Sequence, residues 1–402
     1  MTLDLEHTYG LRLLAKPRVQ RLVLGAVATA VLLLRLGQFV YWTGQPQWAY
    51  DFSFYWTAAS NLLHGLPIYS AQQLAGPYAP QAQQGFLYPP AMAALLVPFA
   101  ALPIDFHALN WLWSGLGAAV LVWAVLALAR VERLDERFEL LRGRGRWWLV
   151  VAAVAFPPVI DELVVGNVHL FLVGLLVAAW IGIRRADSRG DAMAGIAIGA
   201  ATIVKIFPGL LVLWFLLTRR WRAAAWSIVA VVGLAVLSLP VTGLQPWLDY
   251  PTVLANLSLT PDAVDALAPT FWLAPYLGFT IARLVVTVAG LAILAYVVLG
   301  RRSDDRIGFS TTIALSVLMT PALYTSYLTV LVVPLILGLS AGIGLGWLGL
   351  SYLLLWGGQQ DALGDWSWVV RRALPTLGAL LLLGLLVAEQ DHRSVEGEIG
   401  AR

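Results

Sequence analysis

An aspartate just after the first apolar stretch is the first residue that could do chemistry. Asp51 follows the apolar run 22–42 and lies in the aromatic segment 50–56. A carboxylate partly shielded from water near a membrane surface can accept a proton from a hydroxyl group. The alternative is a solvated aspartate that caps a helix beginning at Phe52. The local sequence leaves both interpretations open.

A lysine inside an apolar stretch is the second such residue. Lys205 lies within the segment 202–208 and is surrounded by hydrophobic residues. An ionisable group at membrane depth costs roughly 2.5–3.5 kcal/mol on insertion scales, which favours a function such as holding a lipid phosphate. The alternative is that Pro208 breaks the helix and the ammonium group reaches the interface. Arg35 and Arg283 also interrupt apolar runs, and each is either a second phosphate ligand or a packing residue.

A polar stretch between two apolar segments contains two carboxylates, an amide and an imidazole. Asp161 and Glu162 are adjacent, so on a helix they point to different faces and form a poor acid–base pair. Asn167 and His169 could contact a sugar or a phosphate. A satisfied polar turn between two helices is an equally good interpretation of this stretch.

A hydroxyl-rich turn near the end of the chain could line a sugar pocket. It contains Tyr324 and Tyr327, although tyrosine at a membrane interface needs no special explanation. The sequence contains no Walker loop, dinucleotide glycine fingerprint or His-Glu metal helix. ATP-driven transport and metal-dependent hydrolysis lose support accordingly.

The elements that must position these residues are helices in a membrane. Of the 402 residues, 59% are hydrophobic and only 12% are charged, about half the share of a soluble domain. Too few charges remain to cover a globule of this size, so its apolar surface must face lipid. We therefore expect an all-α, polytopic transmembrane protein that forms a single integral membrane domain over 1–402.

Other partners are disfavoured by the composition. The chain has no cysteine, so disulfides and thiolate metal sites are impossible. The formal net charge is only +3 and the basic residues are spread over short loops, which argues against nucleic acid. The run 22–42 ends in aromatic residues rather than in a small-residue cleavage site, so we expect a retained first span.

The positions of arginine predict the orientation. Apolar segments are numerous, and we expect about 11–13 transmembrane helices, several of them short. By the positive-inside rule, the arginine-bearing loops lie in the cytoplasm. These loops are the N-terminus, 130–146, 184–190, 218–222 and 300–306. The intervening loops are then external: 43–88, 163–168, 241–271 and 357–368.

The region 88–146 is ambiguous in this topology. Two apolar segments, 88–103 and 107–129, lie between an external and a cytoplasmic loop, where an odd number of crossings is required. Either the first segment is a partial insertion, or the loop 130–146, which also contains acidic residues, lies outside.

The order of these features resembles glycosyltransferase family 87, the polyprenol-phosphate-mannose-dependent mannosyltransferases of the GT-C superfamily. Spaced matches run from about residue 50 to 335, which is most of the chain. The residues that carry the resemblance are Asp51 with Tyr55 and Ala58, Gly65-Leu66-Pro67-Ile68-Tyr69, Tyr88-Pro89-Pro90 with Pro98 and Pro103, Gly166-Asn167, Lys205 and Pro208 followed by Arg219-Arg220-Trp221, and Pro321 through Tyr327 with Pro334.

The resemblance implies an enzyme whose active site faces outside the cytoplasm, in the plasma membrane. The fold would be GT-C-like, with a long first external loop (43–88) that carries interfacial helices and catalysis, and a second external loop at 241–271. Asp51 would be the general base, deprotonating an acceptor hydroxyl that displaces polyprenyl phosphate from the sugar with inversion. Lys205 first and Arg283 second would neutralise the departing phosphate, so no metal and no cofactor are expected.

The resemblance also implies the partners. These are a polyprenyl-phosphate sugar donor, with mannose as the family's sugar, a glycolipid or glycan acceptor, and membrane lipids. The residues expected to bind substrate are Tyr55, His64, Tyr69, Tyr88, Asn167, His169, Tyr324 and Tyr327.

Two departures from the family pattern bear on activity. The family's Gly-Gln is Gly166-Asn167 here, which keeps the amide. Its Trp-x-His turn reads Tyr324-Thr325-Ser326, which leaves His64 and His169 as the nearest substitutes for that histidine. The rival hypotheses are a membrane carrier or lipid flippase without covalent chemistry, and a non-catalytic partner in glycan assembly. No second copy of the Lys205 and Pro208 break is found in the other half, which counts against a transporter with paired halves.

Overall fold

The computed structural model describes residues 17–46, 48–76, 85–258, 267–300, 304–320, 323–356 and 373–399, with side chains from 22 to 391. This part of the chain is mostly helical and contains no strand, which confirms the all-α expectation. The α-helices are α2 (Pro17–Thr43), α3 (Tyr50–Leu63), α4 (Ala71–Ala75), α5 (Pro90–Ala100), α6 (Phe106–Val131), α7 (Leu134–Arg137), α8 (Trp147–Ala155), α9 (Pro157–Val165), α10 (His169–Arg185), α11 (Ser188–Val204), α12 (Leu210–Leu217), α13 (Trp221–Thr242), α14 (Gln245–Ser258), α15 (Pro269–Leu277), α16 (Phe279–Leu299), α17 (Asp305–Leu318), α18 (Val332–Ala341), α19 (Leu345–Leu354) and α21 (Leu374–Ile399). The 3-10 helices are η1 (Glu139–Leu141), η2 (Gly143–Arg146), η3 (Phe207–Gly209) and η4 (Thr325–Leu331).

The protein is a multi-pass membrane protein. Within the described residues, five helices are long and apolar enough to cross a bilayer: α2, α6, α13, α16 and the 374–391 part of α21. The bent pair of η2–α8 and α9, with a 60° bend, makes a sixth if it is one span. The count of 11–13 is not reached by this criterion, because many of the expected apolar segments are helices of 8 to 17 residues.

Caps and prolines set the ends of the helices that matter for the site. Pro157 stands at the first position of α9, where a missing N–H is harmless, and Gly166 ends that helix with φ +71°. The Asp105 carboxylate accepts from the backbone N–H groups at the start of α6. As expected from Pro208, the helix breaks after Lys205, and α12 resumes at Leu210.

The length of helix α5 bears on the ambiguity in the region 88–146. It has 11 residues, about 16 Å of helix, whereas a span needs about 20 residues. The long α6 that follows has 26 residues and spans easily. These lengths favour a partial insertion of α5 and a single crossing by α6.

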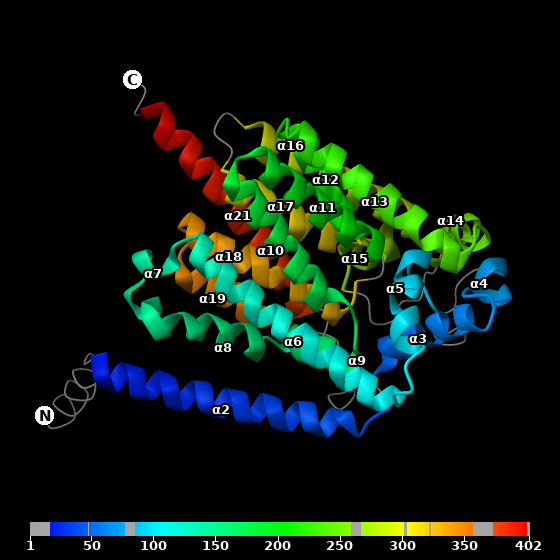
Figure 1. The fold of residues 1–402 in the computed structure, drawn as a ribbon. Coiled ribbons are helices and arrows are strands. Elements are labelled where there is room, and N and C mark those ends of the chain that lie inside the picture. Colours follow the sequence, from blue (N-terminus) through cyan, green and yellow to red (C-terminus); the bar gives the residue numbers. More distant parts are fainter. Residues whose placement is uncertain are drawn as a thin grey trace, which may run out of the picture.

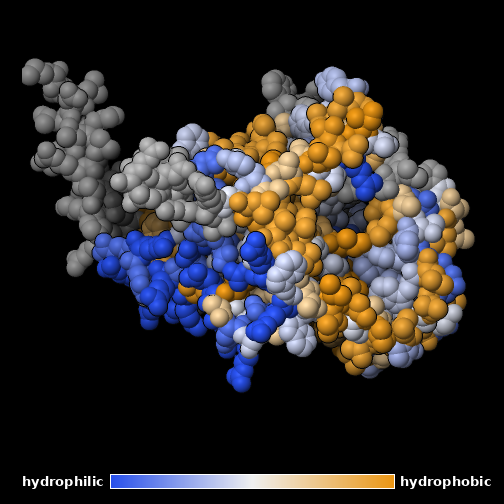
Figure 2. Space-filling view, turned by 90° about the horizontal axis from the view of Figure 1, so that it is seen from above, coloured by the Kyte–Doolittle hydropathy of each residue, from blue (hydrophilic) through white to orange (hydrophobic). Residues whose placement is uncertain are grey.

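The loops rich in arginine meet at one end of the molecule. Arg184 and Arg306 both pair with Glu132, and Arg220 pairs with Asp305 at 2.6 Å, so four separate loops are joined by ion pairs. In Figure 1 the start of α2, α7 and the end of α21 lie at the left, and Figure 2 shows hydrophilic side chains gathered on that same side. Apolar side chains dominate the middle of the visible surface, as expected for a lipid-facing band.

The loops predicted to be external meet at the opposite end. The helices α3, α4, α5 and α14 lie together at the right of Figure 1. Tyr69 of the first loop stacks on Tyr250 of α14, and the Ala49 N–H donates to the Val164 carbonyl across loops. The loop 357–368 lies outside the described residues.

The first external loop carries a helix, α3, whose aromatic side chains partly face the protein interior. Phe52 and Tyr55 are completely buried and pack around Trp113 of α6. The reason is that α3 is covered by α5 on one side, which closes an aromatic core over it.

Candidate functional site

Asp51 is held inside the first turn of α3 and does not cap it. The N-cap is Ala49, whose side chain makes no capping bond, and its φ of 60° is a left-handed conformation that costs an alanine energy. Its N–H donates to the Val164 carbonyl, so a neighbouring segment holds this backbone in place. The solvated-cap interpretation is wrong, because the Asp51 carboxylate instead accepts a hydrogen bond from another loop.

The partner of Asp51 is Asn167, on the turn between α9 and α10. The Asn167 side-chain Nδ2 donates to Asp51 Oδ2 at 2.5 Å. Gly166 makes this approach possible: a Cβ there would lie 2.8 Å from Phe52 Cβ and 2.7 Å from Asn110 Oδ1. Its φ of +71° is also one that residues with side chains rarely adopt. The glycine therefore serves both the turn and the packing of that turn against α3.

Asn167 connects several parts of the cluster. Its Oδ1 accepts from the hydroxyls of Tyr55 at 3.0 Å and Tyr88 at 3.1 Å, and from the Val168 backbone N–H. Its backbone carbonyl accepts from Trp113 Nε1 at 3.0 Å. These bonds fix which side-chain atom is oxygen and which is nitrogen, so the amide must present its N–H to Asp51.

Lys205 lies at the C-terminal end of α11 and reaches the same cluster. Its Nζ donates to Tyr88 at 3.3 Å and to His169 Nε2 at 2.9 Å, and it lies 3.6 Å from the centre of the Tyr327 ring. The residue is only 8% exposed. Within the described residues Lys205 forms no ion pair with a carboxylate at 4 Å or less. Its direct contacts are Tyr88, His169 and the Tyr327 ring, and the charges of Asp51 and Glu162 act on it from farther away.

His169 connects Lys205 to a buried carboxylate, that of Glu162. Its Nδ1 lies 2.7 Å from Glu162 Oε2, and its backbone N–H donates to Glu162 Oε1 at 2.5 Å. An Nδ1–H that donates to Glu162 leaves Nε2 free to accept from Lys205, which is the neutral tautomer. Asp161 points elsewhere and accepts from the Ser326 backbone, as the different-faces argument predicted.

The surroundings of Asp51 affect its acidity in opposite directions. Burial raises the pKa of Asp51 above the ordinary value, while the Lys205 charge and the Asn167 hydrogen bond act to lower it. The balance leaves the pKa raised. A carboxylate in such surroundings is a stronger base than a solvated one, because it binds a proton more tightly.

Seven of the predicted site residues come together in this cluster. They are Asp51, Tyr55, Tyr88, Asn167, His169, Lys205 and Tyr327. Tyr324 lies at its edge, with its ring 6.3 Å from that of Tyr327. Pro321, which belongs to the same predicted turn, lies outside the described residues.

Three predicted site residues lie apart from the cluster. His64 is exposed at the end of α3, where its Nδ1 contacts the Ser60 carbonyl at 2.8 Å. Tyr69 donates to the Tyr88 backbone at 2.7 Å, so it supports the cluster from behind. Arg283 lies on α16, and none of the hydrogen bonds and ion pairs among the described residues joins it to the cluster.

Sequence reasoning missed the roles of Glu162 and Trp113 in this cluster. Glu162 was considered only as the neighbour of Asp161, whereas its spacing of seven residues from His169 brings the two together across a tight glycine turn. The sequence signal for this contact is Gly166, a helix-ending glycine that lies between the polar residues Glu162 and His169. Arg35, a packing residue or a phosphate ligand by sequence, donates to the Ala155 carbonyl and lies over the Trp356 ring, which is packing.

Comparison with known proteins decides the family. The family model for glycosyltransferase family 87 matches residues 86–323, more than half of the chain. The chain belongs to glycosyltransferase family 87. The match includes Asn167, His169 and Lys205 but begins after Asp51. Membership in a glycosyltransferase family supports glycosyl transfer and weakens the case for a carrier.

The curated relatives are mycobacterial glycosyltransferases. A polyprenol-phosphate-mannose-dependent alpha-(1-2)-phosphatidylinositol pentamannoside mannosyltransferase of Mycobacterium tuberculosis is 26% identical over 81% of this chain and 77% of its own. A protein of the same name from Mycolicibacterium smegmatis is 25% identical over 67% of this chain and 66% of its own. An alpha-(1->3)-arabinofuranosyltransferase of M. tuberculosis is 28% identical over 47% of this chain, and the match spans 41% of that protein's length.

Proposed function

We propose that this protein moves a sugar from a polyprenyl-phosphate donor to a hydroxyl of a lipid or glycan acceptor, with inversion, at the outer membrane face. The donor class is supported by the names of two relatives, which are polyprenol-phosphate-mannose-dependent. Mannose is the proposed sugar on the same ground. The mycobacterial arabinofuranosyltransferase shows that the similarity also extends to an enzyme named for another sugar.

The chemistry needs a base and a cation on opposite sides of the anomeric carbon. In the proposed reaction the Asp51 carboxylate takes the proton of the acceptor hydroxyl, whose oxygen forms the new bond to the anomeric carbon. The bond to the polyprenyl phosphate oxygen breaks at the same time, and that phosphate leaves with the bonding electron pair. The Lys205 ammonium neutralises the charge that develops on the leaving phosphate.

One observation supports this proposal more strongly than any other. Asp51 and Lys205 belong to a single hydrogen-bonded network, because Tyr88 contacts both Lys205 and the amide that holds Asp51. They come from loops separated by more than 150 positions in sequence. A carboxylate with raised pKa and a nearby cation without a direct carboxylate partner are what an inverting transfer from a phosphate leaving group requires.

The test compares wild type with Asp51→Asn in liposomes that contain radiolabelled polyprenyl-phosphate mannose and a lipid extract of the host. The substitution keeps the shape and removes the base, so we expect transfer to fall by about a hundredfold or more with donor binding retained. Asp105→Asn is the matched control, since Asp105 is an exposed helix cap on the same side and asparagine also caps.

The outcomes separate the rival hypotheses. Equal transfer by wild type and Asp51→Asn would reject Asp51 as the base and direct attention to Asp161 and Glu162. Donor binding without transfer by the wild type would favour the carrier, and a lipid-flipping assay would then be decisive.

A further inference from the structure

A cavity of about 590 Å³ lies at the end of the molecule opposite to the Asp51 cluster, and arginines dominate its polar walls. They come from α7 and its N-cap, from the last turn of α10 and from the first turn of α17. The arginines are Arg133, Arg137, Arg184, Arg185 and Arg306. A positive-inside bias places arginines in loops, but it does not require them to converge on one cavity.

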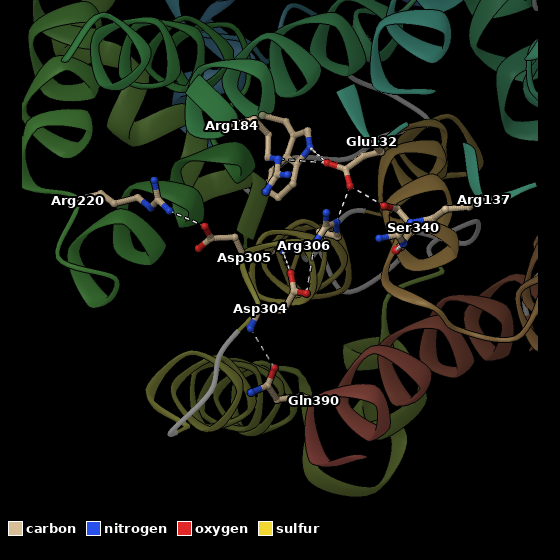
Figure 3. A network of polar contacts seen from close by, with 10 residues as sticks. Glu132, Arg137, Arg184, Arg220, Asp304, Asp305, Arg306, Ser340 and Gln390 are labelled. Atoms are coloured by element: carbon tan, nitrogen blue, oxygen red, sulfur yellow. Dashed lines mark hydrogen bonds and ion pairs between the residues drawn. The ribbon is translucent and has the colours of Figure 1, made fainter. Parts of the chain in front are cut away.

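A buried carboxylate holds two of these arginines in place. Glu132 is completely buried and accepts from Arg306 Nε at 2.5 Å, from Ser340 Oγ at 2.5 Å and from Trp180 Nε1 at 2.9 Å. Arg184 Nε lies 3.5 Å from the same carboxylate. Figure 3 shows both guanidinium groups directed at Glu132 from different helices. Held in this way, they lose little further freedom when a ligand binds.

The arginines of the cavity are not all neutralised. Arg306 also contacts Asp304, Arg185 contacts Asp187, and Arg133 contacts Glu136. Arg137 donates to the Ser340 backbone carbonyl, and among the described residues it has no carboxylate partner. The cavity therefore keeps an unpaired guanidinium, next to exposed arginines whose pairs are weak. An anion is the ligand that this charge distribution favours.

The position of the cavity relative to the bilayer indicates which anion it binds. Glu132 follows Trp113, a member of the Asp51 cluster, by 19 positions along α6, which is about 28 Å. The hydrocarbon core of a bilayer is about 30 Å thick, so the cavity lies at the headgroup level of the opposite leaflet. A second cavity, in the segment that follows α7 along the chain, is lined in part by Arg142, Arg144 and the exposed Trp147, residue types that are common at a membrane interface.

We propose that the cavity binds the phosphate group of an anionic phospholipid from the leaflet opposite the Asp51 cluster. Guanidinium groups match the geometry of phosphate oxygens and bind them bidentately. The proposal is independent of the glycosyl-transfer chemistry, because no residue of the Asp51 cluster takes part.

The test uses the full-length protein in a neutral detergent. Phosphatidylglycerol, phosphatidylcholine or inorganic phosphate is titrated, and the thermal unfolding midpoint and the number of retained lipids by native mass spectrometry are recorded. The cavity variant is Arg133→Gln with Arg184→Gln, which leaves Glu132 its bonds to Arg306, Ser340 and Trp180. The matched control is Arg222→Gln, an exposed arginine outside the cavity.

We expect phosphatidylglycerol to bind preferentially. The cavity variant should bind it at least about tenfold more weakly, because it loses at least one charge-assisted hydrogen bond. Arg222→Gln should bind like wild type. If the cavity variant bound inorganic phosphate more weakly but phosphatidylglycerol as wild type does, the cavity would still be a phosphate site, and its ligand would be a soluble phosphate. Equal lipid and phosphate binding by wild type and the cavity variant, with both variants folded, would overturn the proposal.

Discussion

At the scale of single residues, the site depends on how one amide is oriented. Asn167 gives its N–H to Asp51 because its oxygen is already occupied by two tyrosine hydroxyls and a backbone N–H. One of these tyrosines, Tyr88, links the amide to Lys205. Uncharged side chains therefore connect the Asp51 carboxylate to the Lys205 ammonium group.

The Asn167 bond predicts a pH effect. Burial raises the pKa of Asp51 and the Asn167 hydrogen bond lowers it, so Asn167→Ala should raise the pKa further. Since the base must be ionised, activity rises with pH through this pKa. The acid limb of kcat/KM should move to higher pH by about one unit, the value of one such bond. Tyr55→Phe is the control, because Tyr55 bonds the amide and not the carboxylate. An unmoved acid limb in Asn167→Ala would argue against Asp51 as the titrating base.

The two candidate phosphate ligands can be separated directly. Lys205→Gln removes the charge next to Tyr88 and His169, whereas Arg283→Gln removes a charge with no described link to the cluster. We expect at least a tenfold rise in KM for the polyprenyl-phosphate donor, with a lower kcat, for Lys205→Gln. Arg283→Gln should bind the donor as wild type does. The reverse result would transfer the phosphate role to Arg283.

At the scale of elements, the site is built where three helix ends meet. The start of α3 provides Asp51, the turn between α9 and α10 provides Asn167, and the end of α11 provides Lys205. Gly166 sets the distance between α3 and the α9–α10 turn, because its missing side chain lets the turn touch Phe52.

Gly166→Ala should therefore separate these elements. Alanine at φ +71° costs about 1 kcal/mol or more, and its Cβ would also overlap Phe52 Cβ at 2.8 Å. Gly65→Ala is a matched control, because Gly65 has φ +68° and nothing within 4 Å of the new atom. We expect both variants to lose some thermal stability, but only Gly166→Ala to lose transfer by tenfold or more. Equal transfer by the two variants would contradict a role for the close approach of Gly166 to Phe52.

At the scale of the whole molecule, the arginine loops and the Asp51 cluster lie at opposite ends. The arginine loops join at one end through Glu132, and α3, which carries Asp51, lies toward the other end (Figure 1). The short α5 leaves α6 as the crossing between them. This arrangement agrees with the positive-inside assignment, which makes the cluster external.

The natural absence of cysteine makes this topology easy to test. Single cysteines at three exposed positions, Gln72→Cys, His107→Cys and Asp135→Cys, are labelled with an impermeant maleimide on intact cells. We expect Gln72→Cys and His107→Cys to react at once, and Asp135→Cys to react only after permeabilisation. Labelling of Asp135→Cys on intact cells would place the loop 130–146 outside and contradict the partial insertion of α5.

The sequence by itself determined the membrane class and the helical fold, and it indicated candidate site residues. Apolar runs and charge counts report burial in lipid directly, because each residue contributes independently of its neighbours in space. Asp51 and Lys205 stood out for the same reason, since a charge beside an apolar run is visible locally.

Only the tertiary structure decided which of the candidates act together. Tyr55 and His64 lie on or at the end of one helix, yet Tyr55 is buried in the cluster and His64 is exposed. The same holds for Glu162, whose carboxylate became part of the network through a turn, and for Arg283, which has no described link to it. The contacts between Asp51, Asn167 and Lys205 depend on how α3, α9 and α11 pack, and that packing joins residues far apart in the chain, which no local pattern records.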